Sequence, residues 1–201
     1  MSSVESAAPL PAGADVRWIL PSVSEIAVDS LGHVLGVSPL TARILVHRGF
    51  GDPAAARAFL SLASPGLSDP MLLRDMDTAV GRIVEALKRR EQILIYGDYD
   101  VDGVCGLVIL YKAIELLGGT VSFYVPHRLE EGYGMREEVI ARAAKKGIKL
   151  LISVDTGIRA HEAVREANRL GLDVIVTDHH LSDGELPAAL AVVNPNRPDC
   201  A

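Results

Sequence analysis

Three stretches of sequence, ILIYGDYDVDG (93–103), LLISVDTG (150–157) and VIVTDHH (174–180), decide the fold of this 201-residue chain. Each begins with a short apolar run, which is typical of a strand buried on both faces of a parallel sheet. Each run is followed at once by carboxylates or histidines. Strands of a parallel sheet run in one direction, so the residues that follow them lie along one edge, where open α/β sheets bind ligands. We therefore expect these polar side chains to converge.

The residues expected at that edge are Asp98, Asp100, Asp102, Asp155, Asp178, His179 and His180. So many carboxylates within a few ångströms repel one another unless cations lie among them. Hard oxygen ligands with one or two imidazoles suit Mn²⁺ or Mg²⁺. The pattern therefore predicts a site for two metal ions that cleaves a phosphoester.

The rest of the chain after residue 92 alternates apolar runs with amphipathic stretches, which is the pattern of repeated βαβ units. Strands are predicted over 93–97, 120–125, 149–154, 173–177 and 190–193, with helices near 104–117, 136–146 and 159–170. The expected fold class is α/β, with a doubly wound parallel sheet.

The first 91 residues have a different character. Residues 1–16 are small, Pro-containing and aperiodic, and we expect a disordered leader there. Residues 17–91 have helical periodicity, with Pro39 near one expected helix start and Asp52 and Pro53 at another. The predicted organisation is a leader over 1–16, a small helical region over 17–91 and a phosphoesterase domain over 92–201.

Composition limits the classes of protein. With 20 Lys+Arg against 26 Asp+Glu, the net charge of −6 argues against a broad basic surface for nucleic acid. A nucleic-acid substrate remains compatible, because divalent cations offset charge at the site. Two cysteines are too few for a disulfide framework, and Cys105 is expected to be a buried thiol. No secretory signal and no apolar stretch of about 18 residues is present, so we expect a cytoplasmic protein without a membrane partner.

Each motif also has a simpler interpretation. The run D-x-D-x-D-G from Asp98 imitates a calcium loop, but such a loop needs Glu where Ile109 stands and a helix before it. Asp102 could merely cap the following helix, and Asp155 could cap the next one. A histidine pair on a surface loop often has no function. After a buried strand at the ligand edge it is a metal-ligand candidate, with the preceding Asp178 as its support.

The order GDYDVDG, SVDTG and TDHH resembles the DHH phosphoesterase superfamily over most of residues 72–199. Within it, YGDYDVDG (96–103), VPHRLEEGYGM (125–135) and VVNPNRPDC (192–200) are similar to the RecJ family of bacterial single-strand-specific exonucleases. Upstream, SPLTARILVHRGF (38–50) and DPMLLRDMDTAVGRI (69–83) agree with the same family.

The resemblance implies a role for each site residue. It makes Asp100, Asp102 and His179 metal ligands and makes Asp155 a ligand shared by two ions. His180 would contact the scissile phosphate, with Asp178 supporting the histidines.

The resemblance has implications for two further positions. Tyr96 stands where other branches carry a histidine, so Asp98 is expected to compensate in part. Arg128 would bind a substrate phosphate; the alternative is a solvated arginine paired with Glu130 or Glu131. Family members also carry a further metal-ligating Asp and a second domain downstream, so the metal shell within these 201 residues is expected to be incomplete.

The function implied is Mn²⁺- or Mg²⁺-dependent hydrolysis of single-stranded DNA from its 5′ end, in DNA repair and recombination. Single-stranded DNA would be the substrate, and a single-strand-binding protein a further partner. One alternative is a hydrolase of pyrophosphate, short oligonucleotides or cyclic dinucleotides. Others are a non-catalytic scaffold of the same fold, or an aspartyl-phosphate phosphatase built on Asp100 and Asp102, which would not need the two histidines.

Overall fold

The computed structural model describes residues 22–61, 68–127, 132 and 134–200. The chain divides into two compact units, residues 1–67 and residues 68–201, which are described separately. The expected leader over 1–16 lies outside the described residues.

The described part of the first unit, residues 22–61, contains three short helices, α1 (Glu25–Leu35), α2 (Pro39–His47) and α3 (Pro53–Leu60). Ser24, Ser38 and Asp52 each accept a hydrogen bond from a backbone N–H in the first turn of their helix. These caps satisfy donors that a helix N-terminus otherwise leaves unpaired. The small shared core consists of Val28, Leu31, Ala42, Leu45 and Ala56. The helical character expected for this part of the chain is confirmed.

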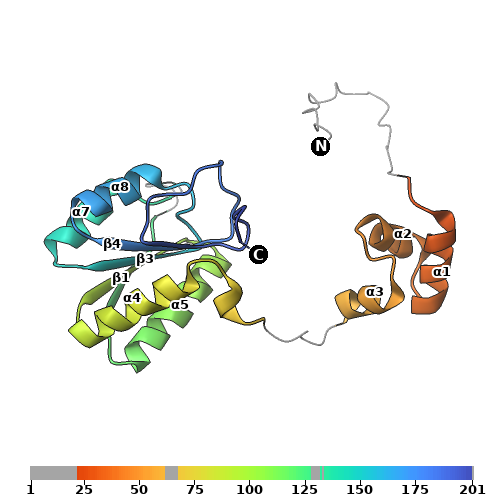
Figure 1. The fold of residues 1–201 in the computed structure, drawn as a ribbon, viewed down its shortest axis with the longest axis horizontal. Helices are drawn as coiled ribbons and strands as arrows, with labels where there is room; N and C mark the ends of the chain where they lie inside the picture. The colour runs from red at the N-terminus through yellow and green to blue at the C-terminus, as the bar shows by residue number, and fades with distance from the viewer. Residues whose placement is uncertain (1–21, 62–67, 128–131, 133, 201) are drawn as a thin grey trace, which may run out of the picture. The chain divides into compact units, whose positions relative to one another are not determined.

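The second unit is a five-stranded sheet with helices on both faces (Figure 1). Its elements in chain order are η1 (Pro70–Leu72), α4 (Met76–Arg89), β1 (Gln92–Gly97), α5 (Val101–Leu116), β2 (Thr120–Tyr124), α7 (Glu137–Lys145), β3 (Leu150–Val154), α8 (His161–Arg169), β4 (Asp173–Thr177) and β5 (Ala191–Val193). All neighbouring strands are parallel, in the order β2-β1-β3-β4-β5. The predicted α/β class is therefore confirmed, with strand limits within a residue or so of those expected.

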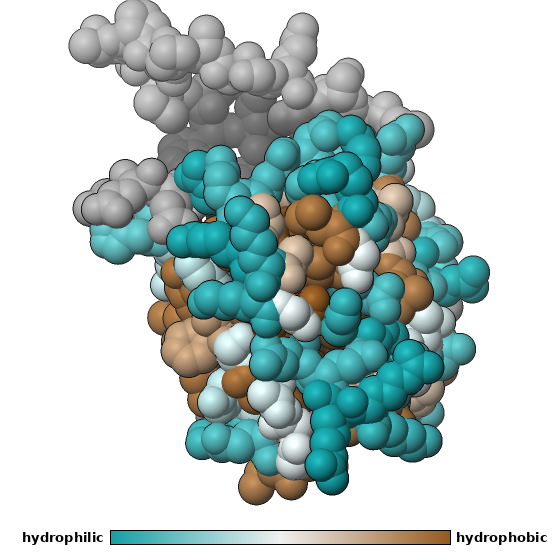
Figure 2. All heavy atoms as spheres, turned by 90° about the vertical axis from the view of Figure 1, so that its left-hand side faces the viewer, coloured by the Kyte–Doolittle hydropathy of each residue, from teal (hydrophilic) through white to brown (hydrophobic). Residues whose placement is uncertain are grey.

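Alternate residues of each strand enter two different cores. Ile93 and Ile95 of β1 pack with the helices α4 and α5, whereas Leu94 and Tyr96 pack with α7 and α8. Figure 1 shows α4 and α5 together on one face of the sheet and α7 and α8 on the other. Because both faces are covered, the central strands are apolar at almost every position. On the molecular face in Figure 2, hydrophilic residues surround smaller hydrophobic patches, which is ordinary for a protein surface.

Helix α4 packs against the sheet, within the compact unit that begins at residue 68. The predicted domain limit after residue 91 stays a prediction. The expectation of a buried Cys105 was wrong, because this thiol is exposed. Helix α5 is apolar around most of its circumference, so periodicity did not indicate which side is buried. The buried residues of α5 are Gly103, Leu107 and Ile114.

Among the described helices, none has both the length and the apolar character needed to cross a membrane.

The strand order creates a defined position for a site. From β1 the chain crosses to β2 on one side and then returns to β3 on the other side of β1. The carboxyl ends of β1 and β3 therefore flank a topological switch point, where open α/β sheets bind ligands. Asp98 and Asp100 follow β1, and Asp155 follows β3.

Candidate metal centre

The turn from β1 into α5 places two carboxylates at this switch point. Asp98 is buried, and its Oδ1 accepts a hydrogen bond from Tyr99 N at 2.8 Å. Asp100 is the N-cap of α5, with its Oδ1 accepting from Gly103 N at 3.1 Å. The cap is thus Asp100, and the carboxylate of Asp102 stays exposed. A Cβ on Gly103 would lie 2.8 Å from both the Cβ and the O of Asp98, so only glycine allows this approach.

These carboxylates have shifted pKa values. Burial raises the pKa of Asp98, and the charges of Asp100 and Asp102 add to this effect. The hydrogen bond from Gly103 N lowers the pKa of Asp100, assisted by a side-chain contact with Asp102. Asp100 is therefore the carboxylate most readily kept ionised.

Asp155 is the most unusual carboxylate in the second unit. It is 7% exposed, has a left-handed backbone conformation with φ of 61°, and its N–H donates to Thr177 O at 2.9 Å. Both carboxylate oxygens are buried and receive no hydrogen bond from the described residues. Burial, followed by the charge of Asp102 and contacts with Asp100, raises its pKa to about 6. It does not cap α8, whose N-cap is Ala160. A buried carboxylate that accepts no hydrogen bond from the described residues, with an imidazole nitrogen of His179 beside its Oδ1, fits a bound cation.

Asp178 organises the turn after β4. Its Oδ2 accepts from Ile158 N at 2.9 Å, and its Oδ1 accepts from the backbone N–H groups of His179 and His180 at 2.7 and 3.1 Å. The Nδ1 atom of His180 lies 2.7 Å from the same Oδ1. Burial acts to raise the pKa of Asp178, but these hydrogen bonds hold it below its ordinary value. The contact with Asp178 in turn raises the pKa of His180. Asp178 thus fixes both the loop and one imidazole.

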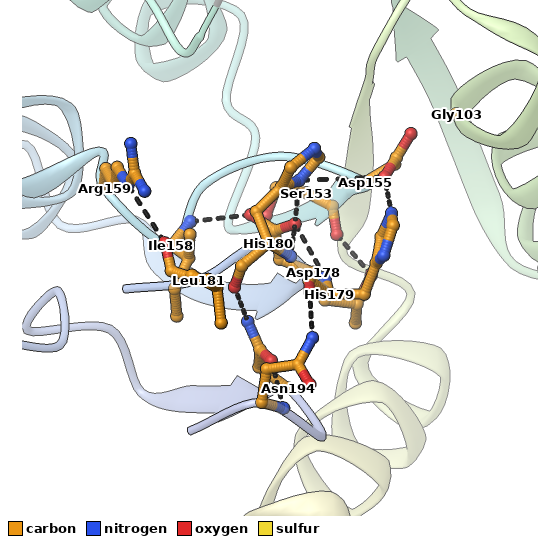
Figure 3. Close-up of polar contacts among 12 residues, drawn as sticks. Gly103, Ser153, Asp155, Ile158, Arg159, Asp178, His179, His180, Leu181 and Asn194 are labelled. Atoms are coloured by element: carbon orange, nitrogen blue, oxygen red, sulfur yellow. Dashed lines mark hydrogen bonds and ion pairs between the residues drawn. The ribbon is translucent and has the colours of Figure 1, made fainter. Parts of the chain in front are cut away.

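The imidazole of His179 connects this turn to the other carboxylates (Figure 3). Its Nε2 lies 2.9 Å from Asp155 Oδ1 and 3.4 Å from Asp102 Oδ2. Two sets of three side chains bring potential ligand atoms within 4.8 Å of one another, and both sets include Asp155. The sets are Asp155, His179 and His180, and Asp98, Asp100 and Asp155. This arrangement suits two cations that share the carboxylate of Asp155. The carboxylate oxygens and imidazole nitrogens of the two sets are ligands that suit Mn²⁺ or Mg²⁺.

Two other positions were singled out from the sequence. Tyr96 is fully buried in the core beneath α7 and α8, where its hydroxyl donates to Gly134 O at 3.0 Å. The ring of Tyr96 therefore has a packing role in this core. Arg128 lies outside the described residues, so its proposed role stays a prediction.

Two asparagines at the site were not anticipated. Asn194 donates from Nδ2 to His180 O at 2.9 Å, and Asn196 donates from Nδ2 to His179 O. Both follow β5, so they belong to the same sheet edge as the acids and histidines. That placement was available from the sequence, but neutral amides after a strand usually indicate only a turn.

A cavity of about 630 Å³ adjoins the metal centre. Asp178 and His180 contribute to its wall, together with Met135, the segment 156–160 and Leu181. Arg159, also in the wall, donates from Nε to Leu181 O at 3.0 Å. The volume is in the range of small-ligand pockets.

Comparison with known proteins agrees with this geometry. Residues 92–201 match the family described as "DHH family, N-terminal domain". The chain is 40% identical over 185 residues to the single-stranded-DNA-specific exonuclease RecJ of Bacillus subtilis, covering 92% of this chain and 24% of that protein. It is 36% identical over 163 residues to RecJ of Escherichia coli, covering 81% of this chain and 28% of that protein. The chain thus spans about a quarter of the length of these relatives.

Two solved structures are similar in fold. A manganese-bound exonuclease RecJ superposes with a TM-score of 0.62 at 38% identity, covering 67% of this chain and 35% of that one. RecJ of Thermus thermophilus with Mn²⁺ also has a TM-score of 0.62, at 30% identity, covering 90% of this chain and 25% of that one. The expected resemblance is confirmed, and the sheet, the ordered motifs and the family match together show that this chain belongs to the DHH family.

Proposed function

We propose that this chain carries the metal-binding half of the active site of a single-strand-specific DNA exonuclease that acts from the 5′ end with two Mn²⁺ or Mg²⁺ ions. The observation that carries the proposal is the pair of ligand sets sharing the buried Asp155. The similarity to proteins described as single-stranded-DNA-specific exonucleases supports the substrate, and the 5′ direction is what the family resemblance implies. Single-stranded DNA is the proposed substrate, a single-strand-binding protein the proposed partner and the cytoplasm the proposed location.

The side chains have distinct tasks in such a reaction. Bound divalent ions would supply Lewis acidity and would lower the pKa of a coordinated water. Asp155 offers two oxygens that are already removed from water, so binding a cation costs it little further desolvation. The low pKa of Asp100 keeps that ligand ionised. Asp178 raises the pKa of His180, so its imidazole holds a proton closer to neutral pH and can donate it to a phosphate oxygen.

The adjoining cavity supports a substrate of nucleotide size. Its wall includes His180, so a group in the cavity lies beside the proposed phosphate contact. Apolar side chains such as Met135 and Leu181 can contact a sugar or base, while Arg159 supplies positive charge. Arg128 remains the proposed phosphate-binding residue from the connection before α7.

The decisive experiment compares substrates in the full-length protein. We expect Mn²⁺-dependent release of mononucleotides from a 5′-labelled single strand, with little action on the same strand in a duplex or on pyrophosphate. Asp155→Ala should reduce turnover by at least about 10³-fold, equivalent to roughly 4 kcal/mol of transition-state stabilisation. Efficient pyrophosphate hydrolysis without strand degradation would instead identify a small-substrate hydrolase. Near-normal turnover by Asp155→Ala would refute the shared-ligand role.

A further inference from the structure

The loop after β5 lies directly against the two histidines of the metal centre and is bonded to their main chain. Asn194 is 1% exposed and donates to His180 O, and the side chain of Asn196 donates to His179 O (Figure 3). The two amides are themselves linked, because Asn194 Oδ1 accepts from Asn196 N at 2.7 Å. The backbone carbonyl groups of His179 and His180 are therefore held by the side chains of Asn194 and Asn196, two residues that are bonded to each other.

This loop is itself firmly anchored. Arg197 is 8% exposed and donates from Nη1 to Val192 O at 2.6 Å and to Asp75 Oδ2 at 2.7 Å. Its Nε also donates to Asp199 Oδ1 at 2.6 Å. Asp75 Oδ2 in turn accepts from Val192 N at 3.1 Å, which ties β5 to the residue before α4. The asparagines thus project from a segment with little freedom to move.

The ring of His179 depends on this main-chain support. Its side chain is 56% exposed, and among the described residues its ring contacts the carboxylates of Asp155 and Asp102 and the neighbouring ring of His180. Asp178 accepts hydrogen bonds from the backbone N–H groups of His179 and His180. The two asparagines donate to the backbone carbonyl groups of the same two residues. With both sides of these peptide groups engaged, the position of the imidazoles relative to Asp155 is set before any ion arrives.

We propose that Asn194 and Asn196 are positioning residues of the metal centre, which raise its affinity for Mn²⁺ by holding the backbone of His179 and His180. The inference rests on the proposed two-metal function. Groups that orient metal ligands without touching the ion commonly change metal affinity by about 10- to 100-fold when removed. The effect here is smaller, because the amides act through the main chain and Asp178 remains in place.

The test is calorimetric titration of the full-length protein with Mn²⁺, together with thermal unfolding in the absence of metal. Asn196→Ala is the primary variant because Asn196 is exposed. The matched control is Asn168→Ala, since Asn168 is also exposed and donates from Nδ2 to Ala188 O at 2.7 Å, in the β4–β5 connection but away from the histidines. Asn194→Ala is the second variant, and its unfolding temperature will show whether loss of a buried amide destabilises the fold.

We expect Asn196→Ala to weaken Mn²⁺ binding about 3- to 10-fold with an unfolding temperature equal to that of the control, and the control to bind normally. Asn194→Ala should weaken binding at least as much at a temperature where it is fully folded. Normal binding by both asparagine variants would refute the positioning role alone. If the unchanged full-length protein binds no Mn²⁺, the metal centre is refuted as well.

Discussion

Replacing Asp155 with asparagine should stabilise the metal-free protein at neutral pH while abolishing its response to metal. The side chain is 7% exposed, and burial together with the charges of Asp102 and Asp100 raises its pKa to about 6. Its ordinary value is 3.8. Asparagine has nearly the same shape but no charge, so it removes the charge repulsion without leaving a cavity. Its amide can also meet the neighbouring carboxylates as a donor.

The magnitude comes from the difference in pKa. Each pKa unit corresponds to about 1.4 kcal/mol, so full ionisation of Asp155 costs the folded state at most about 3 kcal/mol. As pH rises from about 4 to about 6, the unfolded chain releases this proton and the folded chain retains it. The penalty therefore grows across that window and is constant above it. The pKa of about 6 already includes the attraction of His179, which acts to lower it.

The assay is urea unfolding of the wild-type chain and Asp155→Asn in a metal chelator, from pH 4 to pH 7.5. We expect the two free energies of unfolding to be similar near pH 4 and the variant to be more stable by about 1 to 3 kcal/mol at pH 7.5. Adding Mn²⁺ at pH 7.5 should raise the stability of the wild type and leave the variant almost unchanged. A variant that is less stable than the wild type at every pH would show that Asp155 has a structural role in the absence of metal.

Three further predictions concern residues around the centre. Arg128→Ala in the full-length protein should weaken single-strand binding by roughly 1 to 3 kcal/mol and reduce the salt dependence of binding by about one phosphate contact, and Arg128→Lys should recover part of the loss. Titrations of a single strand in Ca²⁺ at several salt concentrations would measure both effects. An unchanged salt slope would make Arg128 a solvated loop residue. Gly103→Ala should destabilise the chain by about 1 to 3 kcal/mol and weaken Mn²⁺ binding, because its Cβ would lie 2.8 Å from Asp98 Cβ; a normal calorimetric titration would contradict this. Arg197→Met should cost about 2 kcal/mol in urea unfolding by removing the guanidinium from the partly exposed Asp75, and a loss below about 0.5 kcal/mol would mean that water replaces the contact.

The strands and the edge that carries the chemistry could be predicted from the sequence. Apolar runs of strand length recur between amphipathic stretches, and the residues after parallel strands must lie along one edge of the sheet. This was sufficient to bring together Asp98, Asp100, Asp155 and His179 without coordinates. The strand positions follow from neighbouring residues, and the shared edge follows from the common direction of parallel strands.

Other features depended on which surfaces meet in the folded chain. The pattern of α4 indicated a helix but not that its apolar side covers the sheet. Because α5 is apolar on nearly all sides, its sequence did not predict which side is buried or that Cys105 is exposed.

Within the site, local motifs specified the types of ligand, and tertiary structure determined their environment. Only folding showed that Asp100 is the cap of α5, that both oxygens of Asp155 are buried and accept no hydrogen bond from the described residues, and that Asn194 reaches the histidine backbone. Desolvation and contacts between distant segments arise from packing, which periodicity along the chain does not encode. The sequence alone therefore determined which chemical groups meet at the sheet edge, whereas the tertiary structure determined their charge state and their support.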